Sequence, residues 1–183
     1  MNRKPQSEYF KDIEYLNHTV NIVPGWKKFD ISKHDYYLSN KDEFLALKKK
    51  YKTKVKKKEI ASVEIRKCRY GLGLFAKQTM RSGTFIGEYT GYLQHGNGDE
   101  YSWDYPEIPG FPELEISALN AGNEMRFINH NHKPNCVAEH FPIDGIYIII
   151  ILSSKYIKPG QQLFLDYGDE YWLDEDRELI IEY

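Results

Sequence analysis

The sequence predicts a mainly β fold with a minor helical part. Beyond Glu59 the chain contains several short runs rich in β-branched and aromatic residues, such as "TFIGEY" and "GIYIIIIL", and Gly, Pro or Asp residues separate them. The runs are spaced at short and irregular intervals, without the alternating helices of a βαβ fold and without an internal repeat. Only one segment, which precedes these runs, has a helical pattern. We therefore expect compact β structure with long loops.

Length and composition limit the classes of protein that fit. The chain has 183 residues, enough for one domain of ordinary size plus an extension, and its 41% hydrophobic and 15% aromatic content is typical of a globular protein. Two cysteines, Cys68 and Cys136, are too few for a disulfide scaffold or a four-thiolate zinc site. We therefore expect reduced thiols and an intracellular protein. No apolar run approaches the roughly 20 residues that span a bilayer, and no signal peptide is expected.

The elements follow in order along the chain. Residues 1 to 35 have no clear hydrophobic period, so no element is predicted there. A helix is predicted from Ser39 onward, because Ser39 and Asp42 resemble a capping box and an apolar stripe follows. The stripe consists of Phe44, Leu45, Leu47 and Tyr51. Strands are predicted in "IASVEIRKC", "TFIGEY" and "GIYIIIIL", and residues 94 to 122 are expected to form short strands in an open meander. Loops of that length usually serve a site.

Three motifs have ordinary structural explanations when each is taken alone. Gly71 and Gly73 in "RYGLGLFA" predict a tight turn or a ligand contact, and they lack the third Gly and the following helix of a dinucleotide-binding fingerprint. The segment "RFINHNHKPNC" offers His130, His132 and Cys136 as conceivable metal ligands, but a polar, turn-rich loop would also explain it. The tyrosine in "LFLDYGDEYW" would ordinarily belong to a core or an interface.

Taken together and in this order, four segments resemble the SET domain of protein lysine methyltransferases. They are "YGLGLFA", "GTFIGEYTG", "GNEMRFINHNHKPNC" and "IKPGQQLFLDYGDEYW". The resemblance covers about residues 61 to 172 and is strongest to compact SET proteins of chlamydia-like intracellular bacteria. It implies small curved β-sheets with a C-terminal pseudoknot, in which "RFINH" passes beneath a loop near the C-terminus. The implied organisation is an N-terminal helical extension at 1–58, a catalytic domain at 59–172 and a tail at 173–183 that closes the active site.

The resemblance also implies a site for S-adenosyl-L-methionine. Arg126 and Phe127 match positions that form the floor of the cofactor pocket. Asn129 and His130 match positions that hold the amino-acid or adenine part of the cofactor. Three further cofactor positions are expected from the first glycine loop and the last motif, namely Leu72, Gly73 and Trp172.

Three tyrosines match the positions that surround the substrate lysine in the family. Tyr167 stands where the family has its active-site tyrosine, and Tyr89 and Tyr101 match tyrosines of the lysine channel. Methyl transfer to an amine requires a neutral nucleophile, whereas the ordinary pKa of lysine is about 10.4. A sulfonium about 4 Å away would lower that pKa by roughly two or three units, so that water could accept the proton. The sequence indicates no carboxylate or histidine base.

The chain departs from the family pattern at several positions. His132 stands where many members have a zinc ligand, and no downstream C-x-C motif is present, so no metal is expected. Asn131 replaces the usual serine, a change that we expect to be tolerated. The tail is expected to close the sites as a short helix or by pairing with a second subunit in a homodimer. Leu165 occupies a substrate-channel position where Phe or Tyr is common, which favours multiple methylation.

Charge is concentrated in one stretch of the chain. Residues 48–58, "KKKYKTKVKKK", hold eight of the 25 Lys and Arg residues, although the net charge is −2. This stretch is either a solvated helix end, a weak nucleic-acid contact or a target of self-methylation. We expect a cytoplasmic or nuclear protein, in a host nucleus if a bacterium secretes it. The expected substrate is a histone or another basic DNA-binding protein. The alternatives are a non-catalytic SET module that binds chromatin or peptide and, less favoured by the charge, a nucleic-acid-binding protein.

Overall fold

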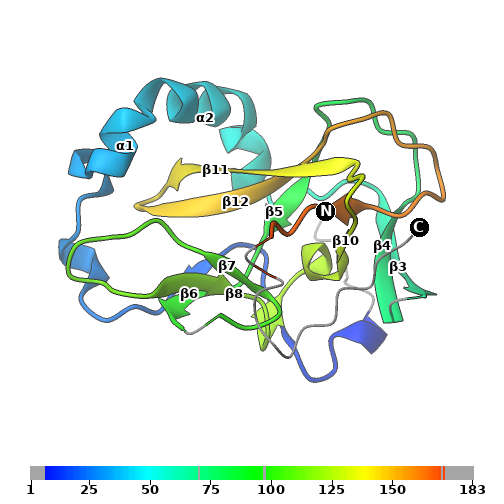
Figure 1. The fold of residues 1–183 in the computed structure, drawn as a ribbon, viewed down its shortest axis with the longest axis horizontal. Coiled ribbons are helices and arrows are strands. Elements are labelled where there is room, and N and C mark those ends of the chain that lie inside the picture. Colours follow the sequence, from blue (N-terminus) through cyan, green and yellow to red (C-terminus); the bar gives the residue numbers. More distant parts are fainter. Residues whose placement is uncertain (1–6, 70, 97, 170, 172–183) are drawn as a thin grey trace.

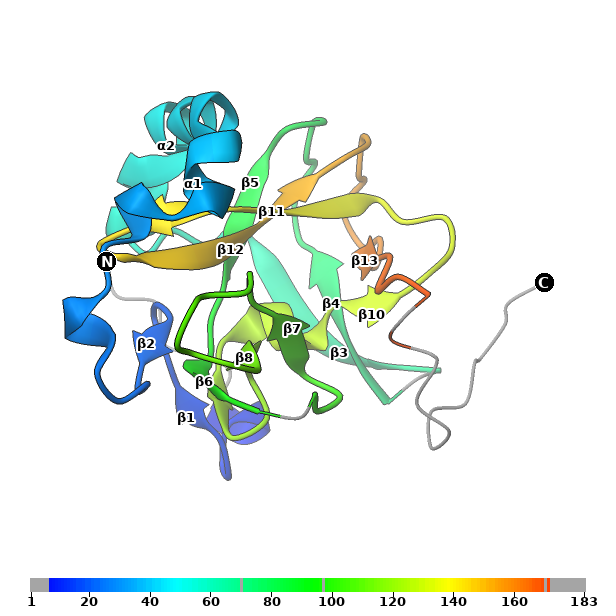
Figure 2. The same cartoon turned by 60° about the vertical axis from the view of Figure 1, so that its left-hand side comes forward.

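The computed structural model describes residues 7–69, 71–96, 98–169 and 171. Strands make up 37% of the structure and helices 21%, which confirms the mainly β class. The strands form five small sheets instead of one large one. Figures 1 and 2 show the two helices, α1 and α2, packed together on one side of the sheets. No helix within the described ranges is long and apolar enough to cross a membrane.

Two of the sheets form the body of the molecule. The first has the order β11-β12-β5, all antiparallel, and its strands are Phe85–Tyr89 (β5), Cys136–Ile143 (β11) and Ile146–Ser153 (β12). Every residue of β12 is buried, as its unbroken apolar sequence suggests. The second has the order β2-β6-β8-β7, with strands Val20–Asn21 (β2), Tyr92–His95 (β6), Ser102–Asp104 (β7) and Leu114–Ser117 (β8).

Three two-stranded sheets complete the fold. Strands Val63–Cys68 (β3) and Gly71–Ala76 (β4) form an antiparallel hairpin, and Glu14–Tyr15 (β1) pairs in parallel with Ala121–Gly122 (β9). Strand Asn129–His130 (β10) pairs in parallel with Phe164–Leu165 (β13). This last pairing brings the "RFINH" segment against the C-terminal motif, as the expected pseudoknot requires. The architecture is therefore that of the predicted SET fold.

The helical region differs in detail from the prediction. Short α1 (Asp35–Ser39) precedes α2 (Lys41–Lys56), so Ser39 ends the first helix and does not cap the second. The N-cap of α2 is Asn40, which makes no side-chain capping hydrogen bond. In the predicted stripe Leu45 is 46% exposed, whereas Val55 is buried with Phe44 and Tyr51. The predicted capping box and the place of Leu45 are therefore wrong. Leu45 lies about 100° around the helix from Phe44 and so leaves the face that Phe44, Tyr51 and Val55 form.

Two further expectations need correction. Residues 1 to 35, for which no element was predicted, contain β1, β2 and three 3₁₀ helices: Ser7–Tyr9 (η1), Trp26–Lys28 (η2) and Ile31–Lys33 (η3). Their strands are only two residues long, so hydrophobic periodicity could not reveal them. Residues 94 to 122 do form short strands, but not a meander, because β8 lies between β6 and β7.

Candidate active site

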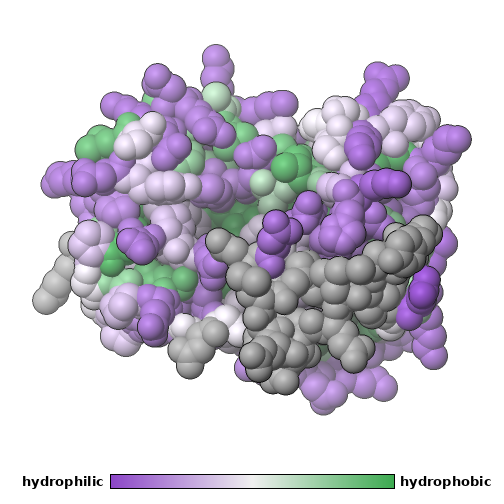
Figure 3. Space-filling model, in the orientation of Figure 1, coloured by the Kyte–Doolittle hydropathy of each residue, from purple (hydrophilic) through white to green (hydrophobic). Residues whose placement is uncertain are grey.

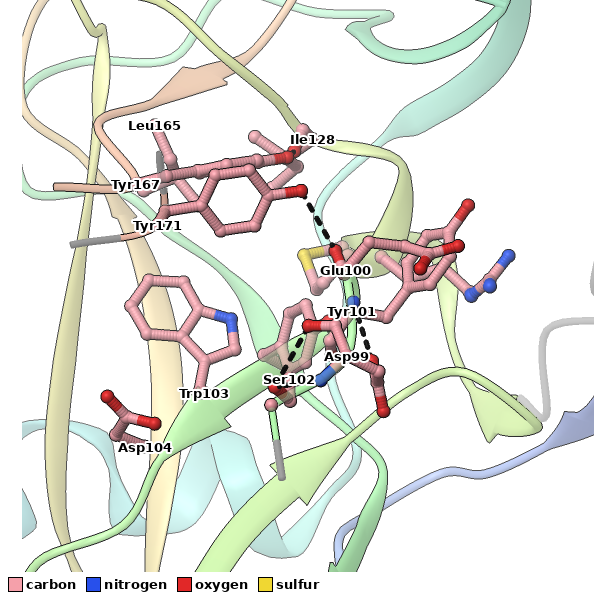
Figure 4. A pocket seen from close by; sticks show the side chains of 14 residues that line it. Asp99, Glu100, Tyr101, Ser102, Trp103, Asp104, Ile128, Leu165, Tyr167 and Tyr171 are labelled. Carbon is pink, nitrogen blue, oxygen red and sulfur yellow. Dashed lines mark hydrogen bonds between the residues drawn. The ribbon is translucent and has the colours of Figure 1, made fainter. Parts of the chain in front are cut away.

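A cavity of about 360 Å³ lies where β5, β7, β13 and the 3₁₀ helix Glu124–Phe127 (η4) meet. Figure 4 shows Tyr167 and Tyr171 together on one side of this cavity and Trp103 on another. Tyr89, from the end of β5, and Tyr101 complete its aromatic lining. Segments far apart in sequence thus supply five aromatic rings to one cavity, which we call the tyrosine cavity.

Tyr167 is held at both ends by the segment that contains β10. Its hydroxyl donates a hydrogen bond to the Ile128 carbonyl at 2.5 Å, and its backbone N–H donates to His130 Nδ1 at 3.1 Å. Burial, and then the neighbouring Tyr171, raise the pKa of Tyr167 well above its ordinary value. Burial also lowers the pKa of His130, which agrees with an unprotonated Nδ1 that accepts a hydrogen bond. The Tyr167 oxygen is therefore a fixed and neutral group.

Tyr89 is a second neutral hydroxyl in the tyrosine cavity. The residue is only 5% exposed, and its hydroxyl donates to the backbone carbonyl of Tyr101 at 2.6 Å. Burial is the main reason that the pKa of Tyr89 lies well above the ordinary value. Both hydroxyls orient groups inside the cavity without carrying charge, because neither can ionise near neutral pH.

Arg126 supplies the one cationic side chain among the described residues of the lining. Its guanidinium lies 3.9 Å from the centre of the Tyr101 ring, a cation–π contact, and its Nε donates to the Ala118 carbonyl at 2.9 Å. These contacts fix the positive charge beside the tyrosines. A fixed cation at this place disfavours the protonated form of an amine that enters the cavity.

The lining also contains acidic residues. Asp99, Glu100 and Asp104 all line the tyrosine cavity. The Asp99 carboxylate accepts hydrogen bonds from the Tyr101 N–H at 2.6 Å and from Ser117 Oγ at 2.5 Å, so it shapes the loop. Glu100 and Asp104 are exposed and lie at the rim. The carboxylates thus make the entrance acidic, while tyrosines form the interior.

Asn129 joins the two segments expected to bind the cofactor. Its Nδ2 donates to the Leu72 carbonyl at 3.1 Å and contacts Cys68 Sγ at 3.5 Å, so β10 is fixed to β4. A Cβ at Gly73 would lie 2.5 Å from Nε2 of the flexible Gln162 side chain, which would have to shift. The structure thus brings Leu72, Asn129, His130 and Tyr167 into one connected set.

The SET-domain family model matches residues 71–168, more than half of the chain. The chain belongs to the SET-domain family. In this SET domain the matched range begins with β4 and ends just after Tyr167, so it contains the β10-β13 pairing and the described lining of the tyrosine cavity except Tyr171.

Curated relatives share the same part of the chain. A histone-lysine N-methyltransferase of Arabidopsis thaliana, MEDEA, is 32% identical over 105 residues, which are 54% of this chain and 15% of that protein. An H3 lysine-4 specific histone-lysine N-methyltransferase of Schizosaccharomyces pombe is 31% identical over 110 residues, 52% of this chain and 11% of that protein. This SET domain therefore spans only a small part of the relatives that it matches. None of these plant and fungal proteins tests the expected bacterial likeness.

Solved structures agree with the family assignment. The polycomb repressive complex 2 of Chaetomium thermophilum contains a chain with a TM-score of 0.56 and 26% identity, matched over 63% of this chain and 16% of that one. A ctPRC2 structure described as autoinhibited and bound to S-adenosylmethionine matches with a TM-score of 0.54 and 28% identity, again over 63% of this chain and 16% of that one.

The remaining predicted residues of the SET domain are placed as follows. Leu165 lines the tyrosine cavity and is 2% exposed. Phe127 does not line it: the ring is buried edge-on against Phe10 at 5.7 Å and Tyr9 at 6.4 Å. Trp172 and the tail at 173–183 lie outside the described residues. The cofactor role assigned to each residue stays a prediction.

Sequence reasoning missed two features of the site. Tyr171 lines the tyrosine cavity, and its ring centre is 4.7 Å from that of Tyr167. Its place in "YGDEYW", four residues after Tyr167, was the available signal. The Ile128 carbonyl, which fixes the Tyr167 hydroxyl, is a backbone group, and no residue type in the sequence indicates it.

The polar side chains of "RFINHNHKPNC" mainly hold the fold together. Asn135 donates from Nδ2 to the Gln162 carbonyl at 2.8 Å, and its Oδ1 accepts from the Phe164 N–H at 2.9 Å. Burial raises the pKa of the Cys136 thiol to about 12, which keeps it protonated. Among the described residues no three His, Cys, Asp or Glu side chains are grouped as metal ligands. The segment therefore contains β10, leads into β11, and is fixed to β13 by hydrogen bonds.

Proposed function

We propose that this SET domain is an S-adenosyl-L-methionine-dependent protein-lysine N-methyltransferase. The observation that carries the proposal is the Tyr167 hydroxyl, fixed on the Ile128 carbonyl inside the tyrosine cavity. The family assignment and the histone-lysine N-methyltransferases among the relatives support it.

The residues beside the tyrosine cavity have the chemistry that this cofactor requires. Asn129 offers an amide, Leu72 and Gly73 offer backbone groups, and His130 is neutral near pH 7 because burial lowers its pKa. A neutral imidazole does not repel a sulfonium, and aromatic faces attract one. When bound, the cofactor supplies an electrophilic methyl group. We assign Leu72, Gly73, Asn129 and His130 to its binding, and Trp172 keeps this role as a prediction.

The residues of the cavity favour a neutral and oriented lysine amine. The Arg126 guanidinium disfavours an ammonium inside the cavity, so the proton leaves to water at the acidic rim. The Tyr167 hydroxyl donates a hydrogen bond to the Ile128 carbonyl, and its oxygen lone pairs can accept a hydrogen bond from an amine N–H. Tyr89 and Tyr167 thereby fix the direction of the amine lone pair without a salt bridge that would hold the lysine charged.

The acidic rim favours a basic substrate. Glu100 and Asp104 stand at the entrance of the tyrosine cavity and would attract a segment rich in Lys and Arg. We propose a histone tail or another basic DNA-binding protein as the substrate. Leu165 leaves more room in the channel than Phe or Tyr would, so we propose more than one methyl group per lysine.

We propose further properties beside this function. The lysine-rich stretch 48–58 forms the C-terminal part of α2, where most of its lysines are exposed, and it would make weak contacts with nucleic acid. A second subunit would complete the site through the tail in a homodimer. The protein would act inside a cell, in the cytoplasm or nucleus where such basic proteins occur, and would be related to the SET proteins of chlamydia-like bacteria.

Two experiments test the proposed function. Calorimetry with S-adenosyl-L-methionine should show binding that Asn129→Ala weakens, with Asp12→Asn as a control at an exposed carboxylate that does not line the tyrosine cavity. Intact-mass spectrometry of core histones should then show whole-methyl mass gains. If the cofactor binds and no protein gains mass, the SET domain is a binding module and the proposal is wrong.

A further inference from the structure

A second cavity lies next to the tyrosine cavity. It encloses about 520 Å³ between β7 and the β11-β12 pair, and the two cavities share Trp103 and Asp104 in their linings. Figure 3 shows a hydrophobic hollow between β12 and β7, bordered by hydrophilic side chains. Trp103 and Asp104 therefore lie between this second cavity and the tyrosine cavity.

The interior of the second cavity is aromatic. Besides Trp103, its lining includes Tyr36, Tyr105 and Tyr147. The rings of Tyr36 and Tyr105 meet the Tyr147 ring edge-on, with centres 5.6 and 5.7 Å apart. Tyr36 comes from α1, so the N-terminal extension builds part of this cavity. Aromatic walls of this kind bind apolar groups and also flat or alkylated cations.

All charged side chains of the second cavity have the same sign. Asp104, Glu107 and Glu139 line it, and its described lining contains neither Lys nor Arg. His140 does not offset them, because burial lowers its pKa and its Nε2 lies 2.5 Å from the Tyr36 hydroxyl. Three carboxylates around aromatic rings, without a resident cation, complement a positively charged side chain.

Two polar groups of the second cavity, one buried and one half-buried, favour a ligand with N–H donors. The Tyr147 hydroxyl is buried and has no hydrogen-bond partner among the described residues. Burial, and then the nearby Glu43, raise the pKa of Glu139, so its ionised form is disfavoured in the absence of a cation. A cationic ligand with several N–H donors could donate a hydrogen bond to the Tyr147 hydroxyl and pair with the Glu139 carboxylate.

We propose that the second cavity binds an arginine side chain of the same substrate segment that places its lysine in the tyrosine cavity. Arginine fits better than lysine, because its planar guanidinium stacks on aromatic rings and pairs with more than one carboxylate. An extended segment advances about 3.3 Å per residue, so an arginine two or three residues from the lysine spans the width of one aromatic side chain. The inference rests on the proposed function and narrows its substrate to segments with both residues.

Binding of synthetic peptides tests this inference without depending on catalysis. Each peptide carries one lysine and, two or three residues to either side, an arginine or the neutral isostere citrulline. We expect wild-type protein to bind the best arginine peptide about tenfold more tightly than its citrulline partner, the size of one charge-assisted contact. The double variant Glu107→Gln/Glu139→Gln should lose this preference and keep its affinity for citrulline peptides. The matched control Asp12→Asn/Glu59→Gln removes two carboxylates that do not line the cavity and should keep the preference.

The outcomes separate the two proposals. Equal binding of arginine and citrulline peptides by wild-type protein would overturn the inference, as would an unchanged preference in the Glu107→Gln/Glu139→Gln variant. A preference that the variant loses supports the inference even if no peptide is methylated, and that result would instead contradict the proposed function. Methyl transfer with an arginine preference in kcat/KM supports both.

Discussion

Two neighbouring residues of β5, Glu88 and Tyr89, face opposite sides of the strand and enter very different surroundings. Tyr89 lines the tyrosine cavity, where its hydroxyl stays neutral. Glu88 lines a different cavity on the other side, and its Oε1 accepts a hydrogen bond from the Thr19 N–H of the N-terminal extension at 2.8 Å. Its Oε2 is buried without a hydrogen-bond partner among the described residues. Strand β5 thus has the tyrosine cavity on one side and the hydrogen bond between Glu88 and the N-terminal extension on the other.

The difference lies in how each group responds to pH. Burial raises the pKa of Glu88 to about 7, against the opposing hydrogen bonds from Thr19. The pKa of Tyr89 is moved away from neutrality, whereas that of Glu88 is moved toward it. We therefore expect the protonation of the Tyr89 and Tyr167 hydroxyls, for which we propose a catalytic role, not to change with pH near neutrality. The stability of the fold should change with pH in this range. Variants on the two sides of β5 should accordingly affect different quantities.

The largest effect is expected from Tyr167→Phe. Removing the hydroxyl removes an oriented oxygen inside the tyrosine cavity, and loss of such a group typically lowers kcat by about 10²–10³-fold. Steady-state methyl transfer to a histone peptide measures this. Cofactor affinity should stay within about twofold of wild type. The reason is that Phe keeps the ring and the hydrogen bond from the backbone N–H of residue 167 to His130 Nδ1. Unchanged kcat would remove Tyr167 from the mechanism.

The next effect concerns stability and the far side of β5. In the unfolded chain Glu88 loses its proton near its ordinary pKa of 4.5, whereas in the fold its pKa is about 7. The folded state therefore binds more protons between these values, and stability falls as pH rises through this window. The loss amounts to at most about 3 kcal/mol.

Urea unfolding measures this effect with Glu88→Gln as the test variant. The neutral amide cannot ionise, so the variant should lose much of the decrease in unfolding free energy between about pH 5 and pH 8. Its methyl-transfer rate should remain within about twofold of wild type, because the side chain faces away from the tyrosine cavity. An equally steep pH dependence in the variant would show that Glu88 is not the responsible group.

A smaller effect is expected from Tyr89→Phe. The variant loses one neutral hydrogen bond, from the Tyr89 hydroxyl to the Tyr101 carbonyl, which is worth about 1 kcal/mol. Activity should fall about fivefold to tenfold through misplacement of Tyr101, and the pH dependence of stability should not change. A combined measurement of kcat and urea unfolding checks both points. If Tyr89→Phe altered the pH dependence as Glu88→Gln should, the two sides of β5 would not be independent.

The change expected at Leu165 concerns the ratio of products more than the total rate. Leu165→Tyr should narrow the lysine channel and shift products toward fewer methyl groups, with total turnover reduced by no more than about tenfold. Mass spectrometry of a peptide substrate over time gives the ratio of mono-, di- and trimethyl products. A product ratio equal to that of wild type would show that Leu165 does not limit the space around the amine.

The sequence predicted the strands of the fold better than its N-terminal part. Apolar runs such as Ile146–Leu152 are decided by local composition, so β12 could be predicted directly. Strands of two residues, such as β1 and β2, depend on partners about 70 to 110 residues away and leave no local pattern. The predicted helix is interrupted at Asn40, between α1 and α2, and the periodicity of one segment could not reveal this break.

The site was predicted where a motif marks it. The family resemblance placed Tyr89, Tyr101, Leu165 and Tyr167 around the substrate lysine, and all four line one cavity. Arg126, expected in the cofactor pocket, lines the same cavity. The roles of these residues stay predictions. The second cavity could not be predicted, since Tyr36 of α1 and Tyr147 of β12 lie together only in the folded chain. Phe127 shows the opposite case, where a motif residue proves to pack against the extension.

The most direct test of the central claim is tandem mass spectrometry of core histones after incubation with isotope-labelled S-adenosyl-L-methionine. Wild-type protein and Glu88→Gln should both place labelled methyl groups on lysine Nζ, while Tyr167→Phe should place almost none. Labelling that is absent with wild-type protein, or equal with Tyr167→Phe, would contradict the assignment of methyl transfer to the tyrosine cavity.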